Sequence, residues 1–157
     1  MALPTRELAC SPVKGSMLWP LTRMMGKKNG VSGGVGGSQH LCAHNFYSNG
    51  ILGGIVANAM GMAFAEKYKK SGNIVVVFMG DGTWGEGISY EALNMASLWS
   101  VPILVVVENN RYAQSTPVRF NLAGSIAKRV QSFDIACNEI ESNDVAVLYP
   151  RCYEAVN

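Results

Sequence analysis

The stretch "NIVVVFMGDGTWGEG", residues 73–87, decides the fold, because it joins an apolar run to a polar turn and then to a helix. The unbroken apolar run predicts a strand over 73–79, of the kind that parallel sheets cover on both faces. Apolar residues then recur at three- and four-residue steps, which predicts a helix over 86–99. "PILVVVE" predicts a second buried strand over 102–108. This order indicates a β-α-β unit with a right-handed crossover.

Helices and strands alternate on both sides of this unit. Upstream, we interpret the glycine-rich residues 29–50 as an ordered loop, and lysines followed by Gly72 end a predicted helix over 51–70. Downstream, we expect a loop at 109–118, a short helix near 124–131, a strand near 133–139 and a last helix from about 143, capped by Ser142 or Asn143. A helix near 14–26 is expected within a poorly defined N-terminal segment, residues 1–28.

The alternation predicts an α/β fold of three layers, with a largely parallel sheet and helices on both faces. The expected strands are few for a complete doubly wound domain, and no strand follows the last helix. We therefore interpret residues 1–157 as a single, partial domain. The composition is 48% hydrophobic and only 15% charged, which indicates buried subunit contacts. A net charge of +2 argues against a nucleic-acid partner.

Cysteine usage and hydropathy bear on the compartment. The four cysteines form no C-x-x-C pair, so we expect free thiols in a reducing environment. Residues 50–65 are the one membrane candidate, but they are shorter than a span and Asn58 interrupts them, which favours a buried helix. The N-terminus lacks the apolar core of a secretion signal. We expect a cytoplasmic chain, or one of the mitochondrial or plastid matrix in a eukaryote.

Two polar residues follow the two predicted strands of the β-α-β unit. Asp81 and Asn110 are 29 positions apart, yet the carboxyl ends of neighbouring parallel strands meet at one edge, where ligands bind. Carboxylate, amide and carbonyl oxygens suit Mg²⁺. Gly80 and Gly82 let the backbone approach a ligand, and a helix start near Gly85 favours phosphate. The alternative is a plain strand-to-helix turn in which Asp81 is an N-cap.

These motifs resemble a known family. "GDG" followed after 26 residues by "NN" is similar to the thiamin diphosphate signature. The run "GDGTWGEGISYEALNMASLWSVPILVVVENNRYAQSTP" looks like the alpha subunit of the decarboxylating component of 2-oxo acid dehydrogenases, of the pyruvate, branched-chain or acetoin type. "GGVGGSQHL", "FYSNGILGG" and "GMAFAEKYK" resemble segments of the same family in the same order, so the resemblance covers residues 26–150.

The resemblance implies a thiamin diphosphate-binding fold, here its diphosphate-binding domain, with Mg²⁺ and the cofactor bound. Mg²⁺ would be held by Asp81, the Asn110 side chain and the Tyr112 carbonyl. Gly80, Gly82 and Thr83 would lie at the diphosphate, and Gly50 and Leu52 would contact the aminopyrimidine. For Leu52 the alternative is plain core packing.

Two further features have open interpretations. His40 matches a histidine of the family's "GGS-x-H" segment, and would either line the cofactor channel as a catalytic residue or brace the loop. We interpret His44 as a loop or surface residue. Small residues four apart on one helix face suit close helix packing, either inside the domain or between subunits: Gly53, Ala57, Gly61 and Ala65.

The resemblance also implies partners. Oxidative decarboxylation of a 2-oxo acid would need a beta-type subunit, which supplies the glutamate that activates the aminopyrimidine, and a lipoyl acyltransferase core. The assembly would be alpha2beta2 or a homo-oligomer, and the alpha chain alone would be inactive. The chain is shorter than the family pattern at both ends. Two alternatives therefore stay open: a non-catalytic alpha-like module that assembles with or regulates a related subunit, and a fragment of a transketolase-like thiamin enzyme.

Overall fold

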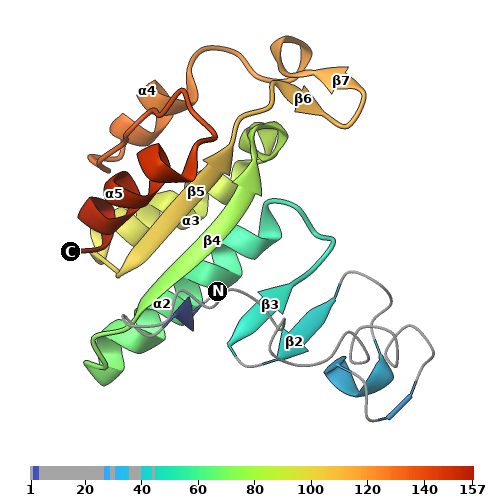
Figure 1. The fold of residues 1–157 in the computed structure, drawn as a ribbon, viewed down its shortest axis with the longest axis vertical. Coiled ribbons are helices and arrows are strands. Elements are labelled where there is room, and N and C mark those ends of the chain that lie inside the picture. The colour runs from blue at the N-terminus through green and yellow to red at the C-terminus, as the bar shows by residue number, and fades with distance from the viewer. Residues whose placement is uncertain (1, 4–26, 29–30, 36–39, 44) are drawn as a thin grey trace.

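A parallel β-α-β unit forms the centre of the chain in a computed structural model, which describes residues 2–3, 27–28, 31–35, 40–43 and 45–157 (Figure 1). Strands β4 (Ile74–Gly80) and β5 (Ile103–Glu108) pair in parallel, and α3 (Gly87–Leu98) connects them. The register pairs Val75 with Ile103 and Gly80 with Glu108. The predicted unit is therefore confirmed, with boundaries within about two residues of those expected.

The hydrophobic core lies between this unit and α2 (Gly54–Lys69). Residues 75, 77 and 79 of β4 alternate toward the helices, as a period of two requires. The buried side chains of the core are Val56, Ala59, Met60, Ala63, Val75, Val77, Met79, Trp84, Ala92, Leu93, Ala96, Val101 and Val130. The helices predicted over 51–70 and 86–99 are thus confirmed, and the structure shows that both pack against the same face of the sheet.

The other face of β4 differs from the expectation. Phe78 is 52% exposed, although its neighbour on that face, Val76, is buried. The expected burial of the strand on both faces is therefore wrong for this part of the described chain. The α/β class is confirmed by the parallel pair and its helices, while the complete three-layer arrangement stays a prediction.

A polar cluster closes the C-terminal end of α2. Lys70 adopts a left-handed conformation, and its N–H donates to the carbonyls of Glu66 and Lys67. Ser71 Oγ and Asn73 Nδ2 donate to Glu66 Oε2 at 2.6 and 2.8 Å. The hydrogen bond from Ser71, then that from Asn73, and the charge of Lys69 hold the pKa of Glu66 below its ordinary value. This cluster fixes the connection into β4.

Short elements occupy the segments expected as loops. Within residues 29–50 the structure has a 3₁₀ turn, η2 (Val31–Gly34), and an antiparallel hairpin of β2 (Leu41–Ala43) and β3 (Phe46–Ser48). Beyond β5 a second hairpin pairs β6 (Tyr112–Ala113) with β7 (Thr116–Pro117), followed by η4 (Val118–Phe120). The backbone of β1 (Ala2–Leu3) adds an antiparallel strand to β4. The helix expected near 14–26 lies outside the described residues.

The C-terminal third contains α4 (Ile126–Gln131) and α5 (Val145–Val156), as expected. The strand expected near 133–139 is wrong, since this segment pairs with no described strand. Ile135 and Cys137 instead pack on the core from an extended segment, and such packing produces the same alternation in sequence. The cap of α5 is also corrected: Asp144 Oδ1 accepts the Ala146 N–H at 2.9 Å, while Ser142 only accepts the N–H of Asp144.

Among the described residues, no helix is both long and apolar enough to cross a membrane.

Candidate functional site

Asp81 opens the 3₁₀ turn η3 (Asp81–Gly85), which directly follows β4. Its side chain is 1% exposed. Oδ1 accepts the N–H of Gly82 at 2.9 Å, whereas Oδ2 is buried without a partner among the described residues. An unpartnered buried carboxylate oxygen is costly, and a bound cation relieves that cost. The N-cap alternative is wrong, because α3 begins at Gly87 and Asp81 does not cap it.

The ends of β4 and β5 lie side by side. Their ladder pairs Gly80 with Glu108, so Asp81 lies one residue and Asn110 two residues beyond neighbouring strand positions. The loops that follow also touch: a Cβ built on Gly82 would lie 2.5 Å from the Cβ of Ala113. Only glycine therefore fits at position 82. The structure brings the two sequence segments together at one edge of the sheet, as Figure 1 shows.

Asn110 is held by its own loop. Its Oδ1 accepts the backbone N–H of Tyr112 at 2.9 Å, and the residue is exposed. Between them, Arg111 has φ of +66°, a left-handed conformation that non-glycine residues adopt at some cost. An amide oxygen has two lone pairs, so Asn110 Oδ1 keeps one acceptor position beyond this hydrogen bond. The strained turn thus orients an oxygen at the strand end.

The floor of the η3 turn is made of small or buried residues. Thr83 is 2% exposed. A Cβ on Gly85 would lie 3.4 Å from the carbonyl oxygen of Asn121, and one on Gly82 would lie 3.8 Å from Asn121 Nδ2. Ala113 and Asn121 were not expected from the sequence at this turn. No periodic pattern signals them, since their approach depends on the path of the 109–124 segment.

The segment that precedes α2 reaches the same edge. Gly53 has φ of +55°, and a Cβ built there would fall 2.3 Å from Glu86 Oε2, at the start of α3. Leu52 is 63% exposed, and Gly50 is also exposed. The core-packing interpretation of Leu52 is therefore wrong in this structure. Gly50 and Leu52 are both uncovered in this structure.

Side chains from α3 and α4 support the turn. Ser89 Oγ donates to the Thr83 carbonyl at 3.5 Å, and Tyr90 Oη donates to the Trp84 carbonyl. Arg129 Nη1 in turn donates to Tyr90 Oη. These contacts were also missed from the sequence, because residues 90 and 129 are far apart along the chain and their contact depends on how α4 packs against α3.

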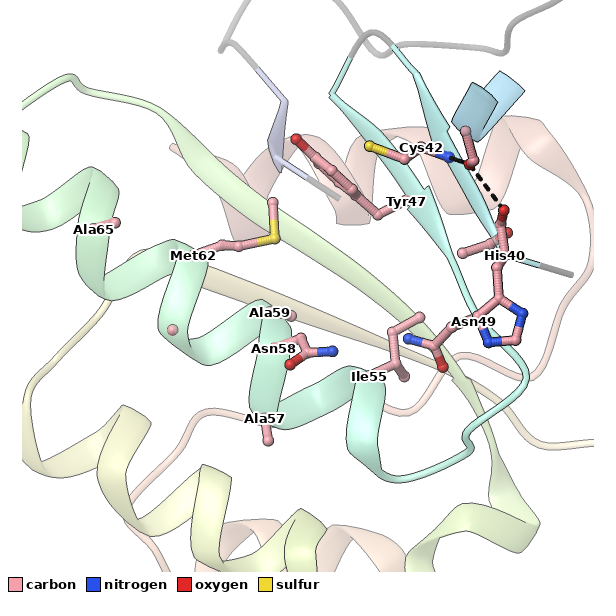
Figure 2. A pocket seen from close by; sticks show the side chains of 13 residues that line it. His40, Cys42, Tyr47, Asn49, Ile55, Ala57, Asn58, Ala59, Met62 and Ala65 are labelled. Atoms are coloured by element: carbon pink, nitrogen blue, oxygen red, sulfur yellow. Dashed lines mark hydrogen bonds between the residues drawn. The ribbon is translucent and has the colours of Figure 1, made fainter. Parts of the chain in front are cut away.

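His40 lines a separate cleft of about 650 Å³ between the β2–β3 hairpin and α2 (Figure 2). Its side chain is exposed, and its carbonyl accepts a hydrogen bond from Ser32 Oγ at 3.0 Å. Figure 2 shows His40 and Asn49 toward the beginning of α2, with Ala65 at the other end of the cleft. Asp81 and Asn110 do not line this cleft, so the structure does not bring His40 together with the strand-end residues. His44 lies outside the described residues.

The small face of α2 forms part of the same cleft. Ala57, Gly61 and Ala65 line it, and a Cβ on Gly61 would meet nothing within 4 Å. Close packing is therefore absent at position 61, whereas a Cβ on Gly53 would lie 3.0 Å from Ile88 Cγ2 of α3.

The donor types at the sheet edge define what it could bind. Among the described residues, no three His, Cys, Asp or Glu side chains gather as a metal cluster. One carboxylate, one amide and backbone carbonyls form a hard oxygen set, which matches Mg²⁺ sharing its shell with phosphate oxygens. The orphaned Asp81 Oδ2 fits such a group.

Comparison with known proteins shows similarity to alpha subunits of pyruvate dehydrogenase. The profile of the family described as "Dehydrogenase E1 component" matches residues 13–157. The chain is 41% identical over 133 residues to the "Pyruvate dehydrogenase E1 component subunit alpha" of Rickettsia typhi, covering 82% of this chain and 41% of that protein. The protein of the same name from Rhizobium meliloti is 36% identical over 153 residues, covering 95% of this chain and 43% of that protein.

A eukaryotic relative shows the same similarity. The "Pyruvate dehydrogenase E1 component subunit alpha, mitochondrial" of Dictyostelium discoideum is 44% identical over 99 residues, which cover 62% of this chain and 26% of that protein. The chain therefore spans less than half the length of the curated relatives it matches.

Proposed function

Because the chain belongs to the dehydrogenase E1 component family, we propose that it is an alpha-type subunit that binds Mg²⁺ and thiamin diphosphate in a 2-oxo acid dehydrogenase. The observation that carries this proposal is the pair of neighbouring strand ends: a buried carboxylate with an unpartnered oxygen follows β4, and an amide held by its own loop follows β5. The names of the relatives favour pyruvate as the 2-oxo acid.

The residues at the edge divide into three roles. Asp81 Oδ2, Asn110 Oδ1 and the Tyr112 carbonyl would hold Mg²⁺. Gly80, Gly82 and Thr83 would border the diphosphate, as the family resemblance implies, and a Cβ on Gly80 would meet nothing within 4 Å. Gly50 and Leu52 would contact the aminopyrimidine. The 3₁₀ turn and the start of α3 add backbone N–H groups, which favour an anion.

Thiamin diphosphate supplies the carbanion chemistry of decarboxylation when it is bound. This chain's own contribution is to bind and orient it. The Gly50–Gly53 segment offers exposed residues, and the family resemblance implies that the carboxylate that activates the pyrimidine comes from another chain. A beta-type subunit would supply that carboxylate, and the complete assembly would be alpha2beta2 or another oligomer that serves a lipoyl acyltransferase core.

The compartment follows the same proposal. We place the chain in the cytoplasm of a bacterium or in the matrix of a mitochondrion or plastid, since one relative is named as mitochondrial. His40 is proposed to line an approach to the site only in the assembled protein, because its cleft does not include Asp81.

A non-catalytic assembly module is the second candidate. Exposed apolar side chains on the sheet and helices favour it, including Phe78 at 52% and Leu98 at 73%. The family match favours either reading over a transketolase-like fragment. An assembly module has no need for the orphaned oxygen of Asp81, so that oxygen supports the cofactor-binding reading.

Calorimetric titration tests the proposal. Thiamin diphosphate is titrated into the chain with excess Mg²⁺, and the experiment is repeated with Asp81→Ala and without Mg²⁺. We expect saturable, Mg²⁺-dependent heats for the wild type and none for the variant. Equal heats for the two proteins would refute the metal site. Size exclusion with a beta-type chain, with and without cofactor, then separates the candidates, because assembly indifferent to cofactor would favour the scaffold.

A further inference from the structure

A directed series of hydrogen bonds ends on the η3 turn. Arg129 Nη1 donates to Tyr90 Oη, and Tyr90 Oη donates to the carbonyl of Trp84. A guanidinium has donors only, so the Tyr90 hydroxyl must accept from Arg129 and point its single proton at Trp84. The positive charge makes that hydroxyl a stronger donor. The orientation of the peptide at the end of the turn is therefore set by a residue of α4.

Arg129 also donates hydrogen bonds to the loop that packs against the turn. Its Nε donates to the carbonyl of Ala123 at 3.1 Å, and Nη2 donates to the same oxygen. Ala123 belongs to the segment that carries Asn121, whose backbone and amide lie against Gly85 and Gly82. One guanidinium thus fixes both the carbonyl end of the turn and the loop that covers its glycines.

The packing around Tyr90 holds this geometry. The Arg129 guanidinium lies 5.5 Å from the centroid of the Tyr90 ring, a cation–π distance. The same ring meets Trp84 edge-on at 6.3 Å between centroids. Tyr90 is part-buried, so water competes weakly for its hydroxyl. These contacts hold Trp84, one residue beyond Thr83, at its carbonyl and at its ring.

We propose that Tyr90 and Arg129 are positioning residues, which act through the Trp84 carbonyl and the Ala123 carbonyl to hold the 81–85 turn in its cofactor-binding shape. Neither residue touches the proposed Mg²⁺ or diphosphate. The identity of the ligand rests on the function proposed above, whereas the control of the turn rests on the hydrogen bonds alone.

Tyr90→Phe tests this proposal, because it keeps the ring and removes only the hydroxyl. The matched control is Ser97→Ala, which also removes one part-buried hydrogen bond from α3, the 2.6 Å bond from Ser97 Oγ to the Phe133 carbonyl. Two readouts are taken on the full chain: amide hydrogen exchange of residues 81–86, and the apparent Kd for thiamin diphosphate with Mg²⁺.

We expect faster exchange across residues 81–86 in Tyr90→Phe and about a tenfold weaker Kd, the change that 1.4 kcal/mol makes. Ser97→Ala should leave both within about twofold of the wild type, whatever it does to Tm. Arg129→Lys should follow Tyr90→Phe, since an ammonium lacks the fork that reaches both partners. The double variant should be no worse than the more affected single variant, because both residues act in one series.

The outcomes separate the two claims. A wild type that binds no thiamin diphosphate would refute the proposed function, while the exchange data would still decide whether Tyr90 controls the turn. The positioning role would be overturned if Tyr90→Phe and Ser97→Ala had the same amide hydrogen exchange rates at residues 81–86 and the same apparent Kd for thiamin diphosphate.

Discussion

Replacing Asp81 by asparagine should stabilise the free chain and remove its response to cofactor. The carboxylate is 1% exposed, and Oδ2 has no partner among the described residues, so folding buries a charged oxygen without compensation. Asparagine keeps the shape and the Oδ1 acceptor for the Gly82 N–H, but leaves a neutral amide where the unpaired oxygen was. An unpaired charged group costs more than an unpaired neutral one, by about 1–2 kcal/mol.

The size of the effect follows from the chain length. For a chain of about 150 residues, 1 kcal/mol moves Tm by roughly 2–4 °C, so free Asp81→Asn should melt about 2–8 °C above the wild type. Cofactor at a hundred times Kd should stabilise the wild type by about 2.7 kcal/mol, or roughly 5–11 °C, and should not stabilise the variant. The order of the two melting temperatures should therefore reverse when Mg²⁺ and thiamin diphosphate are added.

Thermal melts followed by circular dichroism, with and without Mg²⁺ and thiamin diphosphate, measure both effects. Asp144→Asn is the matched control: its exposed carboxylate also accepts one backbone N–H, at 2.9 Å from Ala146, and asparagine caps as well as aspartate. This control should change the free energy of unfolding by no more than about 0.5 kcal/mol, which corresponds to a Tm shift of roughly 1–2 °C. A free Asp81→Asn chain that melts below the wild type, or that keeps the cofactor shift, would refute the reasoning.

Two other predictions concern packing at the 81–85 turn and the dependence of stability on pH below about 4.5. Gly82→Ala places a Cβ 2.5 Å from that of Ala113, so it should lower the free energy of unfolding by about 1–3 kcal/mol in chemical denaturation. Adding Ala113→Gly removes the clashing Cβ and should restore most of this loss. The control is Gly61→Ala, whose new Cβ meets nothing within 4 Å and should not destabilise the chain; an equal loss in both variants would contradict the proposed steric clash at position 82. The depressed pKa of Glu66 contributes stability that is present above its ordinary value of 4.5 and is lost as pH falls through the lower folded value. The Tm difference between wild type and Glu66→Gln should therefore shrink in melts below pH 4.5, and a difference that grows on acidification would reverse the sign of this argument.

The sequence predicts the β-α-β unit because its signals are local. Apolar runs, a glycine-bounded turn and a helical period each lie within one segment, and chain connectivity then places Asp81 and Asn110 at neighbouring strand ends. The support from Arg129 is not predictable in this way, since it depends on how α4 packs against α3. The wrong strand near 133–139 has a related cause: Ile135 and Cys137 alternate toward the core whether or not a neighbouring strand exists to pair with them.

Under the proposed function, the distance along the chain between Asp81 and Asn110 also determines when thiamin diphosphate would act during folding. Helix α3 and strand β5 must form, and β5 must pair with β4, before the side-chain oxygens of Asp81 and Asn110 can approach each other. The unfolded chain and early folding intermediates therefore lack the proposed Mg²⁺ site. The proposed Mg²⁺ and thiamin diphosphate would therefore not nucleate folding. They should prolong the lifetime of the native state, by slowing the unfolding rate, while the refolding rate stays that of the free chain.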